Sequence, residues 1–334
     1  MNASLYEITK KISIIGAGAW GTAIAIQLCK NVDELVIVTR RLNVANAINT
    51  HKKNISLPSF PLLPKNLISS TNIQDIQDSQ CIVISIASQD FKDTLLQLRS
   101  LKISKEVIIV IATKGLLTDG SLLSSITSKI LGNRCAILAG PNLAIEVACD
   151  MPSHTVVGAD TMPFALEVSK LISTDSFVAH PTTDIVSLQI ASCVKNVAAI
   201  LSGMSDGLEY GANNKSWIVA LALEEIEIFS KQLSSQCKVI QSKVVGDLSL
   251  CCNNSGSRNN TFGNKLAQTP KEKRMDFIND YPILTEGRNN LLQLTALANR
   301  LNLKSNLCSV LSNILEEPEN LESHFNAITR LKDQ

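Results

Sequence analysis

Five short runs in the first half of this 334-residue sequence are almost wholly apolar. A strand exposed on one face alternates polar and apolar residues, and these runs do not alternate. Strands buried on both faces are typical of parallel sheets covered by helices, and the intervals between the runs leave room for crossover segments. The N-terminal part is therefore predicted to be α/β, with a doubly wound parallel sheet. The runs are 11–15, 34–39, 81–87, 106–112 and 134–139.

The character of the sequence changes after Pro181. Before it, 154–158 and 176–180 are expected to form two more strands around a helix near 162–173. After it, long apolar and amphipathic stretches predict a mostly helical domain. We place the boundary near residue 185, giving domains 1–184 and 185–334, and expect a loop or short helix at 269–280. The expected helices are 184–202, 214–234, 237–252, 261–268, 286–300, 305–315 and 320–332.

Three glycines follow the first apolar run, in the stretch IIGAGAWGTA (14–23). Gly16, Gly18 and Gly21 fit G-x-G-x-x-G, placed after a strand and at the start of a helix, as dinucleotide binding requires. The first glycine makes the turn, the second lets the pyrophosphate approach, and the third lets the helix pack on the sheet. The alternative is a turn with a purely structural role.

The end of the second predicted strand indicates which dinucleotide is preferred. Sites that prefer NAD usually carry Asp or Glu there, to bind the ribose 2′-hydroxyl. This chain has Arg40 and Arg41 instead. Two guanidinium groups suit a 2′-phosphate, so we expect a preference for NADP(H) with possible use of NAD(H). The alternative is that both arginines are solvated surface residues.

Ligands of doubly wound sheets bind beyond the carboxyl ends of the strands. Lys114 follows the fourth apolar run, and Gly140 and Asn142 follow the fifth. We therefore expect these residues near a bound ligand. A surface role for Lys114 and helix N-capping by Asn142 are the alternatives.

The second domain opens with a stretch, 185–201, that is apolar on nearly every side but contains Lys195. A buried lysine needs an anionic partner, and burial by itself lowers its pKa toward the range useful for acid–base catalysis. Asp247 lies among apolar residues and is also expected to be buried, so the two are predicted to pair. A structural salt bridge between helices would explain them equally well. Downstream, Ser257, Arg258 and Asn259 supply a hydroxyl, a cation and an amide that suit phosphate.

Composition excludes some classes of function. Lys and Arg total 31 and Asp and Glu total 30, so no basic field points to nucleic acid. The nine cysteines include no C-x-x-C pair, which favours buried free thiols in a reducing cytoplasm over disulfides or a metal site. We expect no signal segment and no run long enough to span a membrane.

Together these motifs resemble the bacterial NAD(P)-dependent sn-glycerol-3-phosphate dehydrogenases. The resemblance implies a Rossmann domain followed by an all-α substrate domain, with the site in the cleft between them. It implies reversible hydride transfer between NAD(P)H and dihydroxyacetone phosphate, whose product feeds phospholipid synthesis, and a homodimer. The stretches that carry it lie within residues 12–287: IIGAGAWGTA, IATKGL, AGPNLAIEV, VKNVAAILSGMSDGLEYGAN, VVGDLSL, SRNNTFG and LTEG.

The resemblance also implies residue roles. Lys195 matches the catalytic lysine, the proton donor or acceptor at the substrate oxygen, and Lys114 and Asp247 match its partners. The other positions that match substrate contacts are Gly140, Asn142, Ser257, Arg258 and Asn259. Beside the three glycines, the positions that match cofactor contacts are Ala19, Trp20, Arg40, Arg41, Lys114, Ala144, Arg258, Leu284 and Glu286.

The sequence departs from the family pattern at several positions, which affects pocket shape and rate more than reaction class. Pro is usual at Ala87, Thr or Ser at Asn142, Thr at Cys251, a small residue at Trp217, and Thr-Arg-Gly at 220–222. A 3-hydroxyacid or 6-phosphogluconate dehydrogenase would share the two-part layout but not the SRN and GDL stretches. A non-catalytic NADP-binding sensor would not need Lys114, Lys195 and Asp247 together.

Overall fold

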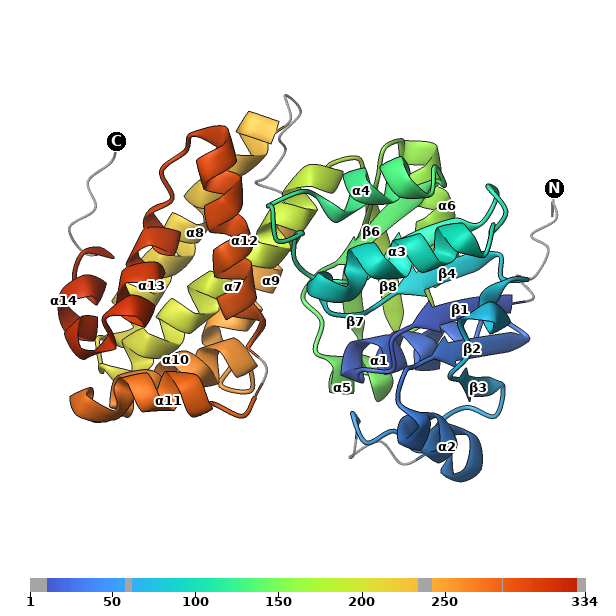
Figure 1. Cartoon of the computed structure of the whole chain (residues 1–334), viewed down its shortest axis with the longest axis horizontal. Helices are drawn as coiled ribbons and strands as arrows, with labels where there is room; N and C mark the ends of the chain where they lie inside the picture. The colour runs from blue at the N-terminus through green and yellow to red at the C-terminus, as the bar shows by residue number, and fades with distance from the viewer. Residues whose placement is uncertain (1–10, 58–61, 234–241, 284, 329–334) are drawn as a thin grey trace. The chain divides into compact units, whose positions relative to one another are not determined.

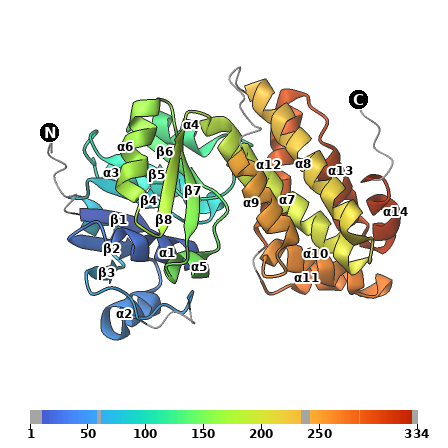
Figure 2. The same ribbon diagram turned by 180° about the vertical axis from the view of Figure 1, so that it is seen from behind.

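The computed structural model describes residues 11–57, 62–233, 242–283 and 285–328. Contacts between Cα atoms divide the chain into two compact units. The first contains the chain up to Lys114 together with Leu123–Ile185, and the second contains Gly115–Leu122 together with the chain from Val186 onward. The first is built on a sheet and the second on helices (Figures 1 and 2).

The first unit contains one sheet with the strand order β3-β2-β1-β4-β5-β6-β7-β8. Neighbouring strands are parallel except for β6 and β7. The chain order reverses at β1, which pairs with β2 on one side and β4 on the other. The strands are β1 Lys11–Ile15, β2 Glu34–Val38, β3 Leu67–Ser70, β4 Cys81–Ile84, β5 Ile108–Ile111, β6 Cys135–Ala139, β7 Ser153–Ala159 and β8 Phe177–Thr182.

All seven strands expected from the sequence are present, and the doubly wound sheet with a helical part after it is confirmed. Two features were not foreseen. The edge strand β3 is short and half polar, and β7 runs antiparallel to β6. Because β7 is antiparallel, its first residues lie beside the carboxyl end of β6, where Ala139 pairs with Val156.

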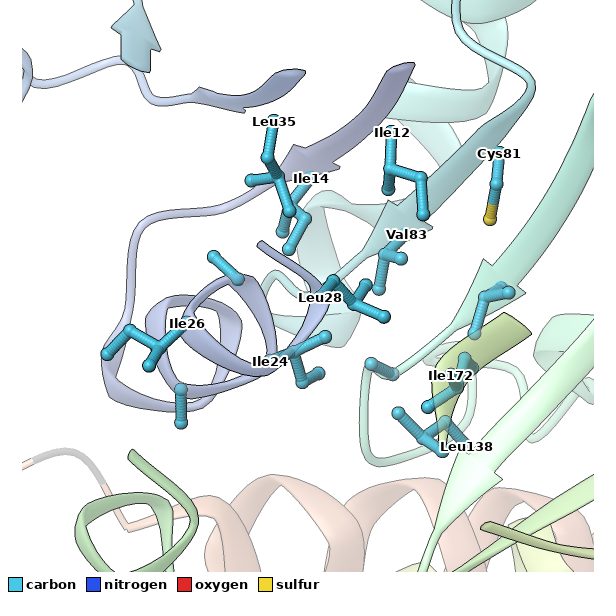
Figure 3. Close-up of a cluster of buried hydrophobic side chains, with 14 of the residues drawn as sticks. Ile12, Ile14, Ile24, Ile26, Leu28, Leu35, Cys81, Val83, Leu138 and Ile172 are labelled. Carbon is cyan, nitrogen blue, oxygen red and sulfur yellow. The ribbon is translucent and has the colours of Figure 1, made fainter. Parts of the chain in front are cut away.

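Helices cover both faces of this sheet, as the unbroken apolar strands require. An extended apolar cluster lies between α1, α6 and one face of the sheet, where Ile14, Leu35 and Val83 meet Leu28 and Ile172 (Figure 3). The intervening strand residues, among them Ile82 and Ile109, are equally buried on the opposite face. The helices and 3-10 turns of this unit are α1 Ala19–Leu28, α2 Leu42–His51, η1 Ile73–Ile76, η2 Ser88–Asp90, α3 Phe91–Ser100, α4 Leu123–Ile130, α5 Ala144–Ala148 and α6 Met162–Ile172.

The regular elements described in the second unit are α-helices and 3-10 turns, and the segment Gly115–Leu122 of this unit is not helical. The polar stretch 269–280 forms a short helix preceded by a 3-10 turn, and residues 234, 237–241 and 329–332 of three expected helices lie outside the described residues. The elements are α7 Ile185–Gly207, α8 Gly211–Leu233, α9 Ser242–Asn253, α10 Arg258–Gln268, η3 Lys271–Lys273, α11 Arg274–Asp280, α12 Glu286–Leu301, α13 Asn306–Glu316, η4 Pro318–Asn320 and α14 Leu321–Phe325.

Helix α7 corrects one expectation. By length and composition it could cross a membrane, although no run of that length was expected from the sequence. However, 94% of its most apolar window is buried within the protein, as in the core helix of a folded domain. Its apolar surface is therefore covered by the chain's own helices.

Candidate active site

The glycine loop follows β1 at the point where the strand order reverses. Gly16 has φ +116°, and a Cβ there would lie 2.0 Å from the carbonyl oxygen of Ser85. A Cβ on Gly21 would lie 2.1 Å from the carbonyl oxygen of Gly16. A Cβ on Gly18, in contrast, would meet nothing within 4 Å. Gly16 and Gly21 are thus required by the fold, whereas Gly18 leaves space open beside the start of α1.

This open space fits the phosphates of a dinucleotide. Gly18 is the N-cap of α1 and supplies no side-chain cap, so the helix begins with uncapped N–H groups. The buried indole Nε1 of Trp20 has no hydrogen-bond partner within the described chain. The loop itself is fixed, because the Ala17 carbonyl accepts three hydrogen bonds, each 3.2 Å long, from Arg41, Asn54 and Ser56.

The two arginines after β2 have different surroundings. Arg40 is 86% exposed and forms an ion pair of 2.7 Å with Asp90. Arg41 donates to the glycine loop through Ala17. Both are exposed residues at the carboxyl edge of the sheet, where a ribose phosphate could bind.

The turn after β6 brings Gly140 and Asn142 together. A Cβ on Gly140 would lie 3.0 Å from the Cα of Thr155, so the turn packs closely on β7. Asn142 donates to the carbonyl of His154 at 2.9 Å, and its buried Oδ1 has no partner within the described chain. The N-cap of α5 is Leu143, without a side-chain cap. The interpretation of Asn142 as a helix cap is therefore wrong.

In the second unit, Lys195 of α7 and Asp247 of α9 form the pair predicted from the sequence. Nζ of Lys195 donates to Oδ2 of Asp247 at 2.5 Å. Their side chains are only 2% and 10% exposed. Sγ of Cys251 donates to the other oxygen of Asp247 at 3.8 Å. The buried ammonium group therefore has a counter-ion on the neighbouring helix.

The pKa of Lys195 is shifted in the direction opposite to the one expected from the sequence. Burial acts to lower this pKa, but the charge of Asp247 and its hydrogen bond, together with Cys251 and Glu286, raise it above the ordinary value for lysine. The expectation that burial brings the pKa toward neutrality is therefore wrong. Lys195 carries its proton at neutral pH and can act as a proton donor.

The cluster at the start of α10 divides into three roles. Oγ of Ser257 caps the helix by accepting from the N–H of Asn260 at 3.5 Å. Arg258 is 56% exposed and contacts Glu286 at 3.3 Å. Asn259 is buried, accepts from the N–H of Gly287 and donates to Asn196. Arg258 is the member of the cluster whose charged group reaches the surface.

The remaining predicted residues are placed as follows. Lys114 is half-buried, three residues after β5, and Ala144 begins α5. Ala19 begins α1, and Leu284 lies outside the described residues. Sequence reasoning missed two buried amides of α12, Asn290 and Gln293. Their signal was two amides three residues apart on the apolar face of an amphipathic helix.

Comparison with known proteins covers both units. The family described as "NAD-dependent glycerol-3-phosphate dehydrogenase N-terminus" matches residues 11–165, and its C-terminal counterpart matches residues 184–326. This chain belongs to the NAD-dependent glycerol-3-phosphate dehydrogenase family. Because both halves match, the family assignment favours this enzyme over the 3-hydroxyacid and 6-phosphogluconate alternatives.

Relatives within the glycerol-3-phosphate dehydrogenase family extend over almost the whole chain. The glycerol-3-phosphate dehydrogenase [NAD(P)+] of Rickettsia bellii is 33% identical over 315 residues, which cover 92% of this chain and 98% of the relative. That of Rickettsia typhi is 32% identical over 312 residues, covering 92% and 97%. The crystal structure of the Coxiella burnetii enzyme is 25% identical with a TM-score of 0.87, covering 97% of this chain and 100% of that one.

Proposed function

We propose that this protein catalyses the reversible reduction of dihydroxyacetone phosphate to sn-glycerol 3-phosphate with NADPH or NADH. The observation that carries the proposal is the buried Lys195–Asp247 pair, in a chain whose two halves both match the glycerol-3-phosphate dehydrogenase family. The glycine loop supports the cofactor assignment, because Gly18 leaves open the space that a pyrophosphate would fill.

In the reduction, the carbonyl carbon gains a hydride and the carbonyl oxygen gains a proton. When bound, the reduced nicotinamide supplies the hydride. The Lys195 ammonium group donates the proton as negative charge develops on the oxygen, and Asp247 keeps that group charged and oriented. A positioned proton donor contributes roughly 10²–10⁴-fold to the rate. In the reverse direction the neutral amine accepts the proton from the alcohol.

Substrate binding is assigned to the remaining residues of the predicted site. The exposed guanidinium of Arg258 suits the substrate phosphate, and Asn259 has a second amide hydrogen without a partner in the described chain. Lys114 is proposed to stabilise the negative charge that develops on the substrate oxygen. Gly140 and Asn142 are proposed to contact the substrate. Phosphate binding then aligns the reacting carbonyl.

The cofactor residues are proposed as the glycine loop with Ala19 and Trp20, the two arginines after β2, and Ala144. Lys114, Arg258, Leu284 and Glu286 complete the set. We expect NADP(H) to be preferred, because Arg40 and Arg41 stand where NAD-preferring sites carry an acidic residue.

The setting of the reaction is inferred from the same family. The product is proposed to supply phospholipid synthesis in the cytoplasm, and the enzyme to act as a homodimer without nucleic acid or membrane insertion. The burial of α7 supports the absence of membrane insertion, and the net charge of +1 supports the absence of a nucleic-acid partner.

The deciding experiment follows oxidation of NADPH with purified protein and dihydroxyacetone phosphate, and reduction of NADP+ with 6-phosphogluconate in a parallel assay. Turnover with the triose phosphate alone supports the proposal. Turnover with 6-phosphogluconate alone would replace it with the other dehydrogenase class. Cofactor binding without turnover of either substrate would support the sensor alternative.

A further inference from the structure

The segment that follows Lys114 is bound to α12 of the helical unit. The N–H of Leu116 donates to Oε1 of Gln293 at 3.0 Å. Leu116 is fully buried and Gln293 is 3% exposed. A buried N–H group needs a partner, and the side chain of Gln293 supplies it.

A second contact fixes the far end of the same segment. The guanidinium of Arg300 donates to the carbonyls of Asp119 and Gly120 and to the hydroxyl of Ser121, at 3.1–3.2 Å. Gly120 has φ +76°, and a Cβ there would lie 2.7 Å from the backbone nitrogen of Leu297. The segment Gly115–Leu122 is therefore held along α12 at two points.

Gln293 is also the end of a chain of buried amides. Oε1 of Gln293 accepts from Asn290 at 2.9 Å, and Oδ1 of Asn290 accepts from Asn196 at 2.7 Å. Oδ1 of Asn196 accepts from Asn259 at 2.9 Å. All four side chains are at most 7% exposed. The chain joins α10, α7 and α12 to the segment after Lys114.

The orientation of each amide is fixed by its neighbours. Every amide donates through its NH₂ group to the carbonyl of the next, from Asn259 to Gln293, and Oδ1 of Asn259 accepts from the N–H of Gly287. Turning one amide over would place two carbonyls or two NH₂ groups face to face. Amides linked donor to acceptor in this way hold one another in one arrangement.

We propose that Gln293 is a positioning residue for the reaction. It binds the main chain two residues after Lys114 to the amide chain that contains Asn259 and Asn196, the neighbour of Lys195. The inference rests on the proposed function, in which Lys114, Lys195 and Asn259 act on one substrate. Gln293 itself does not act on the substrate. It fixes the position of the main chain just after Lys114, where that chain passes onto α12.

The test replaces Gln293 by Met, which has a similar length and no strong acceptor. We expect Gln293→Met to lower kcat for dihydroxyacetone phosphate by roughly 10–100-fold, since displacements of about 1 Å have effects of this size. The Kd for NADPH should change by less than about fivefold, and less than kcat, because the glycine loop and the two arginines after β2 lie outside the altered unit. Gln293→Glu keeps the acceptor oxygen and should restore kcat to within about fivefold of wild type.

Two controls separate positioning from a general effect on stability. Leu292→Ala alters an exposed neighbour on the same helix, 68% exposed, and should leave kcat unchanged. In a double-mutant cycle, Gln293→Met should lower kcat by less than about twofold when Lys114→Met is already present. Gln293 acts by positioning Lys114, so its replacement has little further effect once the Lys114 ammonium group is gone. If Gln293→Met does not fold, Gln293→Asn, which is too short to reach Leu116, replaces it with the same expectations.

The outcomes are distinct. An active wild type whose kcat is unaffected in Gln293→Met overturns this inference alone, as does a fully additive cycle with Lys114→Met. Equal kcat in the Met and Glu variants also overturns it, because the acceptor oxygen would then not matter. A wild type without turnover of dihydroxyacetone phosphate refutes the proposed function, and this inference with it.

Discussion

Lys195 and Asp247 form an ion pair that is almost completely withdrawn from water, with Nζ and Oδ2 2.5 Å apart. A second Lys–Asp pair in the same unit, Lys215 with Asp206, has its charged atoms 2.8 Å apart and its side chains 16% and 36% exposed. Both pairs join two helices, but only the first lies at a predicted catalytic position. The second pair therefore offers a matched control for variants of the first.

Replacing Lys195 by Met should lower kcat for dihydroxyacetone phosphate by roughly 10²–10⁴-fold, because the proton donor is lost. Binding of NADPH, measured by fluorescence titration, should remain. Lys215→Met removes the lysine of the second pair and should leave kcat near the wild-type value. Similar losses in the two variants would show that Lys195 has a structural role only.

Replacing Asp247 by Asn should move the pH dependence of kcat. Burial then acts on Lys195 without its counter-ion, so the pKa of Lys195 falls from its raised value. The reduction should lose its proton donor at a lower pH than in the wild type. Because the folded-state pKa of Lys195 is raised in the wild type, its stabilising effect is present below the ordinary lysine pKa and is lost as the pH rises through the raised value. A descending limb at the same pH in both proteins would contradict the assignment.

Gly18 and Gly21 of the loop should respond differently to replacement by alanine. Gly18→Ala places its Cβ in open space, so it should fold normally and raise the Kd for NADPH by roughly 10-fold or more through a clash with the pyrophosphate. Gly21→Ala places its Cβ 2.1 Å from a backbone oxygen and should destabilise the protein by about 1–3 kcal/mol. Thermal unfolding and cofactor titration measure the two effects. Normal NADPH binding by Gly18→Ala would remove the loop from the cofactor site.

The proposed role of Arg40 and Arg41 in binding the 2′-phosphate can be tested by measuring cofactor preference. Arg40→Ala should raise the KM for NADPH by roughly 10-fold, with little change in the KM for NADH, since only NADPH carries the 2′-phosphate. Arg41→Ala also removes a hydrogen bond to the glycine loop, so it should raise both KM values, that for NADPH more. Asp90→Asn, which removes the carboxylate paired with Arg40, should instead favour NADPH further. Equal or better efficiency of the wild type with NADH would refute the preference.

Glu225 gives the helical unit a dependence on pH. Its buried carboxylate accepts from the hydroxyl of Ser305 and the N–H of Leu307, yet burial outweighs these bonds and raises the pKa of Glu225 to about 7. The folded state then binds more protons than the unfolded state between the ordinary glutamate pKa and 7. The free energy of unfolding should therefore fall as the pH rises through that range, by at most about 1.4 kcal/mol per pH unit from this group alone.

Glu225→Gln tests this effect, because it removes the titration and keeps one acceptor oxygen. Urea unfolding at several pH values should give a smaller decrease for the variant than for the wild type. The difference between the two curves isolates Glu225 from the other titrating groups. Parallel curves would show that the pKa of Glu225 is not raised in the folded protein.

The sequence predicted the sheet because its buried strands are continuous apolar runs, such as Cys81–Ile84, which only a sheet covered on both faces can accommodate. It did not predict β3, whose four residues are half polar. The antiparallel direction of β7 could not be predicted either, since the pattern of residues 153–159 is compatible with a parallel or an antiparallel strand.

Within the candidate site, the Lys195–Asp247 pair was predictable because two charged residues in apolar helices need each other. The direction of the lysine pKa was not, because it depends on a distance of 2.5 Å that spacing does not give. That Asn259 belongs to a buried amide chain could not be predicted for a similar reason. Its partners lie far away in the sequence, Asn196 by 63 residues and Gly287 by 28 residues.

The placement of Gly115–Leu122 with the helical unit means that the main chain passes from one unit to the other after Lys114, Leu122 and Ile185. A chimaera that takes everything after residue 185 from a relative would therefore keep Gly115–Leu122 of the original chain. The α12 of the relative would then contact a segment from another protein at the positions of Gln293 and Arg300. Working chimaeras of this enzyme should need both pieces transplanted together.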